Sequence, residues 1–343
     1  MVVGAGGLGI PASVYLAAAG VGRIGIVDDD VVERSNLHRQ VIYSESDVGV
    51  PKAKAASRHL SKVNPNVSIV THQVKLSSVN AMAILMKYDV VVDCTDNFPA
   101  RYLINDACVL LRKPDVYASI FRFDGQASVF NAQIGPCYRC LFPEPPPAES
   151  VQDCAVAGVL GVLPGIMGGI QAAQAIDILV GKGDSLVGRL LLFNALDMSF
   201  SELQVRKNGD CPVCGANPSV TKLIDYEEFC GSWRPSKSMK VVTPSQLKRK
   251  LDSKPGVVLL DVRDRHEYDL CHIKGAKLIP LPELRERLGE LDKHAETVVY
   301  CHVGTRSGRA VDLLSAEGFS RVRNLAGGIR AWADDVDHSM PVY

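Results

Sequence analysis

The chain has 343 residues, 47% of them hydrophobic, which is enough for two globular domains with buried cores. Its 38 basic and 38 acidic residues balance, so the composition indicates neither a nucleic-acid-binding protein nor a membrane-surface protein. Its ten cysteines do not have the density of a secreted disulfide framework, and no signal peptide opens the sequence, so we expect a cytoplasmic protein with reduced thiols.

The first part of the chain alternates predicted strands with predicted helices. Short apolar runs predict strands at 2–3, 23–28, 67–74, 89–95 and 115–119, and the intervening patterns predict helices at 11–19, 52–63 and 100–111. Strands separated by helices of this length indicate an α/β fold with a largely parallel sheet covered on both faces. The most apolar run, 160–180, contains Gln171, Gln174 and Asp177, so we interpret it as a buried helix rather than a membrane span.

A glycine-rich turn joins the first predicted strand to the first helix. It contains Gly4, Gly6, Gly7 and Gly9, and free backbone N–H groups at such a helix start can bind phosphates. The second strand ends in Asp28, placed to bond a ribose hydroxyl. These features alone fit a nicotinamide-dependent dehydrogenase equally well.

The polar residues that follow favour a nucleoside triphosphate. Asn36, Arg39 and Lys52 supply an amide and two cations near the same turn, and a triphosphate gains more from such charge than a nicotinamide does. The alternative for the two cations is a solvated surface position.

A carboxylate-rich segment follows the strongest predicted strand. Asp96 stands at its end, where a carboxylate facing a phosphate site is a natural magnesium ligand. We interpret Asp93 and Asn97 as caps of the strand end and of the next helix.

These motifs occur in the order GAGGLG, DxDxVxxSNLxRQ, GxxK and DCTDN. The series resembles that of the ubiquitin-activating-type adenylating enzymes, closest to the sulfur-carrier branch of MoeB and ThiF, over roughly residues 2–230. The resemblance implies a Rossmann-like adenylating domain that uses ATP with magnesium. It places Asp28 at the ribose, Asn36, Arg39 and Lys52 at the phosphates, and Asp96 at magnesium and the attacking carboxylate.

The start of the chain departs from that pattern. Members of the MoeB group carry an N-terminal segment whose arginine reaches the phosphates of the neighbouring subunit, whereas only three residues precede Gly4 here. We therefore expect either a truncated start or a protein that works without this arginine.

Two CxxC pairs have the spacing of a closed tetrahedral zinc site. They are Cys137 with Cys140 and Cys211 with Cys214. The alternative is four buried cysteines or two disulfides. The pairs also match the zinc knuckles of the same family, which implies a structural zinc ion without a catalytic role.

Cys154 follows the proline-rich run 143–147. A mobile loop here would let its thiol approach a bound acyl-adenylate, and in some related enzymes the cysteine at this place bonds covalently to the carrier protein. The alternative is a packed small residue at a helix start. We interpret four other isolated cysteines as core or incidental thiols: Cys94, Cys108, Cys230 and Cys271.

A second alternating unit begins after a polar linker. Cys301 ends a predicted buried strand, and a short turn to a helix surrounds its sulfur with N–H groups that stabilise an anion. Only four residues separate Cys301 from Arg306, one fewer than in cysteine phosphatases. The ring of backbone N–H groups is therefore tighter and suits a sulfane sulfur better than a phosphate.

The motifs of this unit resemble the rhodanese, or sulfurtransferase, family over roughly residues 240–343. The resemblance implies that Cys301 carries a persulfide, that the loop to Arg306 cradles it, and that Asp261 and Arg263 support the loop. An inactive rhodanese-like docking module is the alternative.

We thus predict an adenylating domain at 1–230, a linker at 231–240 and a small α/β rhodanese domain at 241–343, the arrangement of MoeZ-type and molybdopterin-synthase-sulfurylase proteins. The resemblance implies ATP-dependent adenylation of the C-terminal glycine of a ubiquitin-like sulfur carrier, of the MoaD, ThiS or CysO kind. Sulfur from a Cys301 persulfide then forms a thiocarboxylate. It also implies a homodimer and a sulfur donor such as a cysteine desulfurase or thiosulfate, with no nucleic acid or membrane. A non-catalytic scaffold, a sulfurtransferase-only protein and a dehydrogenase are the alternatives.

Overall fold

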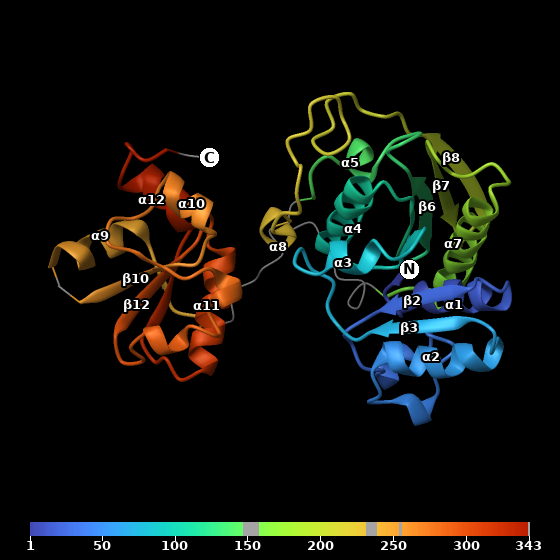
Figure 1. Cartoon of the computed structure of the whole chain (residues 1–343), viewed down its shortest axis with the longest axis horizontal. Helices are drawn as coiled ribbons and strands as arrows, with labels where there is room; N and C mark the ends of the chain where they lie inside the picture. The colour runs from blue at the N-terminus through green and yellow to red at the C-terminus, as the bar shows by residue number, and fades with distance from the viewer. Residues whose placement is uncertain (147–157, 231–238, 254–255, 342–343) are drawn as a thin grey trace. The chain divides into compact units, whose positions relative to one another are not determined.

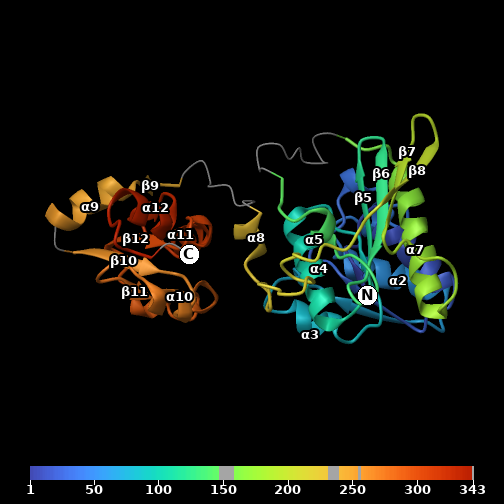
Figure 2. The ribbon, with the colours of Figure 1, turned by 90° about the horizontal axis from the view of Figure 1, so that it is seen from above.

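The computed structural model describes residues 1–146, 158–230, 239–253 and 256–341 (Figures 1 and 2). The chain divides into two compact units, Met1–Cys230 and Gly231–Tyr343. Both are α/β units, which confirms the predicted fold class.

The first unit is built on an eight-stranded sheet in the order β3-β2-β1-β4-β5-β6-β7-β8. Neighbours from β3 to β5 are parallel, as predicted, whereas the β5–β6, β6–β7 and β7–β8 pairs are antiparallel and were not predicted. The strands are β1 (Val2–Val3), β2 (Arg23–Val27), β3 (Ser68–His72), β4 (Val91–Asp93), β5 (Asp115–Phe121), β6 (Asp124–Phe130), β7 (Arg189–Asn194) and β8 (Ser199–Gln204).

Helices cover both faces of this sheet, as Figure 1 shows. One face carries α1 (Gly9–Ala18), α2 (Lys52–Val63) and α7 (Leu163–Val180), and the other carries α3 (Ala81–Leu85), α4 (Phe98–Leu111), α5 (Tyr138–Leu141) and α8 (Tyr226–Phe229). Successive side chains of a strand point to opposite faces, so Val2 packs into the first core and Val3 into the second. The sheet is therefore buried on both faces.

Helix α7 is the one helix in the described ranges whose length and composition would suit a membrane span. It packs instead on α1, β5 and β6 of the sheet. Its Gln171 is fully buried: Nε2 donates to the carbonyl oxygens of Asp93 (2.6 Å) and Val116 (2.9 Å), and Oε1 accepts from the Cys94 thiol at 3.4 Å. The expectation of a helix packed within the fold is confirmed.

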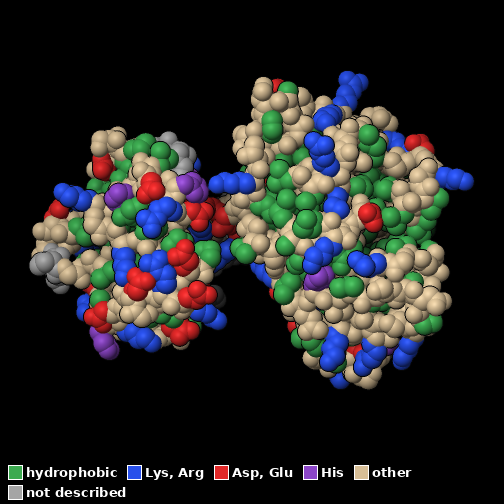
Figure 3. Space-filling model, in the orientation of Figure 1, with side chains coloured by type: hydrophobic (Ala, Val, Ile, Leu, Met, Phe, Trp, Pro, Cys, Tyr) green, Lys and Arg blue, Asp and Glu red, His purple; other side chains and the backbone are tan. Residues whose placement is uncertain are grey.

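The second unit has a five-stranded parallel sheet in the order β11-β10-β12-β13-β9. Its strands are β9 (Val241–Val242), β10 (Val257–Asp261), β11 (Lys277–Leu278), β12 (Glu296–Tyr300) and β13 (Val322–Leu325), and its helices are α9 (Pro244–Ser253), α10 (Arg265–Leu270), α11 (Thr305–Ala316) and α12 (Gly328–Asp335). One core contains α11, and the other contains α9 and α12. On the face of this unit visible in Figure 3, acidic and basic side chains are interspersed, in keeping with the balanced composition.

Candidate nucleotide, metal and sulfur-transfer sites

The glycine-rich turn between β1 and α1 is too tight for side chains at two of its positions. Gly4 has a φ of +95°, and a Cβ there would lie 2.9 Å from the carbonyl oxygen of Cys94. A Cβ at Gly9 would lie 1.8 Å from the carbonyl oxygen of Gly4. The backbone can therefore approach a ligand closely at the start of α1, as phosphate-binding turns require.

Asp28 follows β2 and lies beside this turn. Its Oδ2 accepts the N–H of Ala5 at 2.7 Å, and its Oδ1 accepts the N–H of Asp30 at 2.8 Å. Burial raises the pKa of Asp28 above its usual value, although the N–H of Ala5 and the charge of Lys52 oppose this effect. A carboxylate oxygen has two lone pairs, so Asp28 keeps the capacity to accept a ribose hydroxyl.

Asn36 and Arg39 belong to a segment that packs against the glycine turn. The Cδ of Arg39 lies 3.7 Å from the position that a Cβ at Gly7 would take. Asn36 is buried, and its Oδ1 accepts the N–H of Glu33 at 3.4 Å. The structure therefore brings the predicted phosphate-binding cation Arg39 to the turn.

Lys52 is the first residue of α2, and its side chain is 9% exposed. Its Nζ donates to Oδ2 of Asp30 at 2.8 Å, a carboxylate that is largely exposed. The hydroxyl of Tyr43 lies 3.0 Å from the carbonyl oxygen of Ala5 and 3.2 Å from that of Lys52, so it links the glycine turn to α2. No sequence pattern singles out Tyr43, because its role depends on two contacts with backbone atoms elsewhere in the chain.

Asp96 is exposed in the turn between β4 and α4. Its Oδ1 accepts from the Asn97 amide at 3.4 Å, and it belongs to none of the clusters of metal-ligating groups in the described ranges. Asn97 accepts the N–H of Ala100 at 3.0 Å, and Asp93 accepts the N–H of Thr95 at 2.9 Å. The interpretation of Asp93 and Asn97 as capping residues is confirmed.

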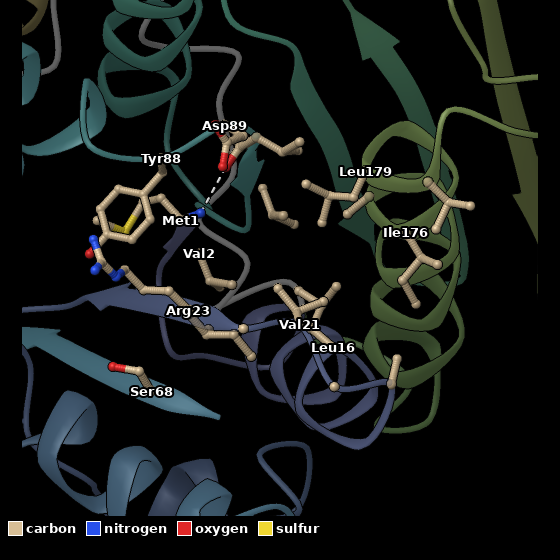
Figure 4. Close-up of a pocket in the computed structure, with 18 of the residues that line it drawn as sticks. Met1, Val2, Leu16, Val21, Arg23, Ser68, Tyr88, Asp89, Ile176 and Leu179 are labelled. Atoms are coloured by element: carbon tan, nitrogen blue, oxygen red, sulfur yellow. Dashed lines mark hydrogen bonds between the residues drawn. The ribbon is translucent and has the colours of Figure 1, made fainter. Parts of the chain in front are cut away.

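The predicted nucleotide residues gather at the carboxyl ends of β1, β2 and β4. Strand order reverses between β1 and β4, and ligands of open α/β sheets bind at such a switch point. A separate cavity of about 700 Å³ lies at the amino ends of the strands, with Arg23, Ser68 and Asp89 on its wall and Leu16 and Ile176 opposite (Figure 4). None of the predicted nucleotide residues lines that cavity.

The two CxxC pairs come together in one cluster. The Sγ atoms of Cys137 and Cys140 are 3.9 Å apart, those of Cys137 and Cys211 are 3.5 Å apart, and those of Cys140 and Cys214 are 3.4 Å apart. A tetrahedral zinc ion with Zn–S bonds of about 2.3 Å would place its sulfur ligands about 3.8 Å apart. The four cysteines are free thiols, and their spacing fits a zinc ion rather than disulfides.

A buried ion pair supports this cluster from the adjacent helix. Arg139, inside the first knuckle, donates from Nε and Nη2 to the two carboxylate oxygens of Asp106, each at 2.8 Å. The hydroxyl of Tyr226 donates to the same carboxylate at 2.8 Å, and Arg139 lies 4.4 Å from the ring centre of Phe229. Sequence reasoning missed this network, which joins α4, α5 and α8.

Cys154 lies outside the described residues. The other cysteines of the first unit outside the cluster are buried: Cys94, Cys108 and Cys230. Burial raises the pKa of Cys230 to about 12, which disfavours its thiolate. The interpretation of these three as core thiols is confirmed.

Cys301 follows β12 directly and is fully buried at the start of the turn to α11. Its Sγ accepts the N–H of Gly304 at 3.1 Å and lies 3.4 Å from the hydroxyl of Ser307. Gly304 has a φ of +104°, a conformation that glycine adopts without strain. The turn thus directs two donors at the sulfur, an arrangement suited to an anionic thiolate or persulfide.

Arg306 is held by a carboxylate at the edge of this turn. Its Nη1 donates to Oε2 of Glu267 at 2.6 Å and its Nη2 donates to Oε1 at 2.8 Å. Just after β10, Arg263 is fully buried with Asp261, to which it donates from Nε and Nη2, and it also donates to the carbonyl oxygen of Cys271 at 2.7 Å. The ion pair of Glu267 with Arg306 was not predicted, because no local pattern indicates a pairing between residues 39 positions apart.

Comparison with known proteins identifies both units. The ThiF family matches residues 1–213, and the rhodanese-like domain matches residues 243–335. The adenylyltransferase and sulfurtransferase MOCS3 of Culex quinquefasciatus is 44% identical over 365 residues, covering 100% of this chain and 83% of that protein. The probable adenylyltransferase/sulfurtransferase MoeZ of Mycobacterium tuberculosis is 44% identical over 353 residues, covering 100% of this chain and 88% of that protein.

Among solved structures, Escherichia coli MccB has a similar fold. The TM-score is 0.56 at 22% identity, with 63% of this chain and 65% of that chain covered. This likeness concerns the fold alone. The chain therefore belongs to the ThiF family and, with its C-terminal rhodanese domain, is an adenylyltransferase and sulfurtransferase of the MOCS3 and MoeZ kind.

Proposed function

We propose that this enzyme adenylates the C-terminal glycine of a ubiquitin-like sulfur carrier protein and then converts it to a thiocarboxylate with sulfur from a Cys301 persulfide. The observation that carries the proposal is Cys301, a buried cysteine with two donors directed at its sulfur, in the same chain as a phosphate-binding turn. A carboxylate does not exchange oxygen for sulfur unaided, because oxide is a poor leaving group. Adenylation replaces that leaving group with AMP.

The first step uses the residues around the glycine turn. Asp28 holds the ribose, while Asn36, Arg39 and Lys52 bind the phosphates. The carrier carboxylate attacks the α-phosphorus, the bond to the β-phosphate breaks, and pyrophosphate leaves with its electron pair. Magnesium bound with Asp96 would neutralise charge on the leaving pyrophosphate. Asp30 now pairs with Lys52, so ATP binding must draw the ammonium from this exposed carboxylate.

The second step takes place at the acyl-adenylate. The terminal sulfur of the Cys301 persulfide attacks the acyl carbon and AMP leaves, which gives an acyl disulfide. A second thiolate then attacks the Cys301 sulfur and releases the thiocarboxylate, leaving a disulfide that an external thiol must reduce. We assign this second thiol to Cys154. Because both units are in one chain, the persulfide stays at a high effective concentration near its acceptor.

Other parts of the proposal concern the state of the protein. The four-cysteine cluster holds one structural zinc ion. The enzyme works in the cytoplasm, where thiols stay reduced, and takes sulfur from a cysteine desulfurase or thiosulfate. It forms a homodimer through the first unit, and light scattering at micromolar concentration that gives a monomer mass contradicts this assignment.

Carrier-dependent exchange of radiolabelled pyrophosphate into ATP tests the first half of the reaction. Mass spectrometry of the carrier tests the second half, since each thiocarboxylate replaces one oxygen with sulfur. A non-catalytic scaffold would show neither activity. A sulfurtransferase-only protein would transfer sulfur from thiosulfate without exchanging pyrophosphate.

A further inference from the structure

Asn324 on β13 contacts two residues that follow Cys301, Gly304 in the turn and Ser307 in α11, yet no motif of the sequence indicated it. Asn324 is buried, with 4% of its surface exposed. Nδ2 donates to the carbonyl oxygen of Gly304 at 2.9 Å, and Oδ1 accepts from the Ser307 hydroxyl at 2.7 Å. The orientation of the amide follows from chemistry, because the opposite one would place its oxygen against a carbonyl that cannot donate.

The first contact acts on the Gly304 donor. The N–H of Gly304 donates to the Cys301 sulfur at 3.1 Å, and the carbonyl of the same glycine is bound by Asn324. The φ of +104° at Gly304 is one that a flexible glycine can leave easily. A hydrogen bond to its carbonyl restrains the next peptide unit and so favours the conformation in which the N–H faces the sulfur.

The second contact acts on the Ser307 donor. The hydroxyl has one hydrogen and two acceptors within reach, Asn324 Oδ1 at 2.7 Å and Cys301 Sγ at 3.4 Å. With a neutral thiol, the amide oxygen is the better acceptor. When the sulfur is a thiolate or a persulfide anion, the charge-assisted bond favours donation to sulfur. Asn324 thus holds the Ser307 hydroxyl in place while the Cys301 sulfur is a neutral thiol.

We propose that Asn324 is a positioning residue for sulfur transfer, which holds the Gly304 N–H and the Ser307 hydroxyl in register with the Cys301 sulfur. The inference rests on the proposed role of Cys301 as the sulfur carrier. Asn324 acts through the two donors and contacts no reacting atom. Fixed donors aimed at a developing anion lower the barrier because they need no reorganisation during the reaction.

The thiosulfate-to-cyanide reaction of the full chain provides the test. The Cys301 thiolate attacks the outer sulfur of thiosulfate, the S–S bond breaks and sulfite leaves with the electron pair. Cyanide then takes the outer sulfur as thiocyanate and restores the thiolate. Asn324→Leu keeps the size of the side chain and removes both contacts. We expect kcat to fall about ten- to a hundred-fold, with the KM for thiosulfate within about two-fold of the original value.

Two further variants separate positioning from general loss of structure. Ser307→Ala also lowers kcat, and the double variant with Asn324→Leu falls less than the product of the single effects, since both act on the same hydroxyl. Thr297→Val is the matched control, because Thr297 is a buried polar residue of the neighbouring strand β12 whose hydroxyl lies 3.5 Å from the carbonyl oxygen of Ala295, at the end of the strand away from Cys301. It should lower the unfolding temperature of the second unit while leaving kcat unchanged.

The outcomes distinguish this inference from the proposed function. If Cys301→Ala retains the thiosulfate reaction, the proposed role of Cys301 is wrong. If Cys301→Ala is inactive while Asn324→Leu keeps the original kcat, or changes KM alone, the positioning role of Asn324 is wrong. Strictly multiplicative effects of Asn324→Leu and Ser307→Ala also overturn it. If Asn324→Leu does not fold, Ser307→Ala provides the test. An unchanged kcat in Ser307→Ala would show that the sulfur does not need the Ser307 hydroxyl, and the positioning role of Asn324 would then be wrong.

Discussion

Removal of one ligand from the four-cysteine cluster should destabilise the first unit without affecting the second. Cys137 and Cys211 are 74 residues apart in the chain, and their sulfurs lie 3.5 Å apart in the cluster. Closing a loop of this length in the unfolded chain removes entropy equivalent to about 4 kcal/mol at 25 °C, which sets the scale of the stabilisation that a zinc cross-link supplies. For a unit of this size each kcal/mol corresponds to roughly 2–4 °C. We therefore expect Cys211→Ala to lower the unfolding temperature of the first unit by roughly 8–16 °C.

Scanning calorimetry of the full chain, together with elemental analysis under reducing conditions, measures both quantities. The second unit, Gly231–Tyr343, is an internal reference whose transition should not move. Cys108→Ala is the matched control, since Cys108 is a buried thiol of the same unit outside the cluster. It should keep one equivalent of zinc and lose only about 1 kcal/mol. Purified protein that holds far less than one zinc, or a Cys211→Ala variant as stable as the control, would refute the reasoning.

Three other predictions follow from the sites. Asp96→Ala should lower carrier-dependent pyrophosphate exchange by at least about a hundred-fold without changing the unfolding temperature, and an unchanged exchange rate contradicts its assignment to magnesium. Cys301→Ala should lose sulfur transfer but keep pyrophosphate exchange, whereas Cys154→Ala should keep both partial reactions and slow only thiocarboxylate release. If Cys301→Ala forms thiocarboxylate from a persulfide donor at the normal rate, delivery of sulfur by Cys301 is ruled out. Burial alone would raise the pKa of Glu267, but the hydrogen bonds and charge of Arg306 outweigh it and hold the pKa at about 2, below the ordinary 4.5. The stabilisation by this pair is therefore complete above pH 4.5 and is lost as the pH falls toward 2. The difference in unfolding temperature between the original chain and Glu267→Gln should shrink over that range. A difference that stays constant with pH contradicts this prediction.

The parallel part of the first unit could be predicted from the sequence because its signals are local. The helix predicted at 52–63 has those bounds in α2, since a proline at position 51 precedes it and an apolar stripe runs along one face. The strand predicted at 89–95 is shorter, Val91–Asp93, because the Asp93 side chain turns back to the N–H of Thr95. Strand β8 was missed, since all six of its residues are exposed and no apolar alternation marks it; pairing with β7 defines it.

The candidate sites likewise combine motifs that could be predicted from the sequence with supporting contacts that could not. Glycine turns, paired cysteines and the cysteine turn are contiguous motifs, so a single sequence contains their whole signal. The contacts that support them join residues far apart in the chain, such as Tyr226 with Asp106, which are 120 positions apart, and Asn324 with Gly304, which are 20 apart. Nothing in a single sequence records such pairs, because many side chains of the same type could satisfy each hydrogen bond.

The buried amide of Gln171 fixes the rotation of α7 about its own axis. Its three hydrogen bonds are made with β4, β5 and the Cys94 thiol, so they form at only one angular setting of the helix on the sheet. A turn of the helix by one residue, about 100°, would leave a buried amide without partners at a cost of about 1–3 kcal/mol. The apolar residues around the amide could slide over the sheet with little penalty. Gln171, the one buried polar side chain of this helix, thus supplies the angular specificity that apolar contacts lack.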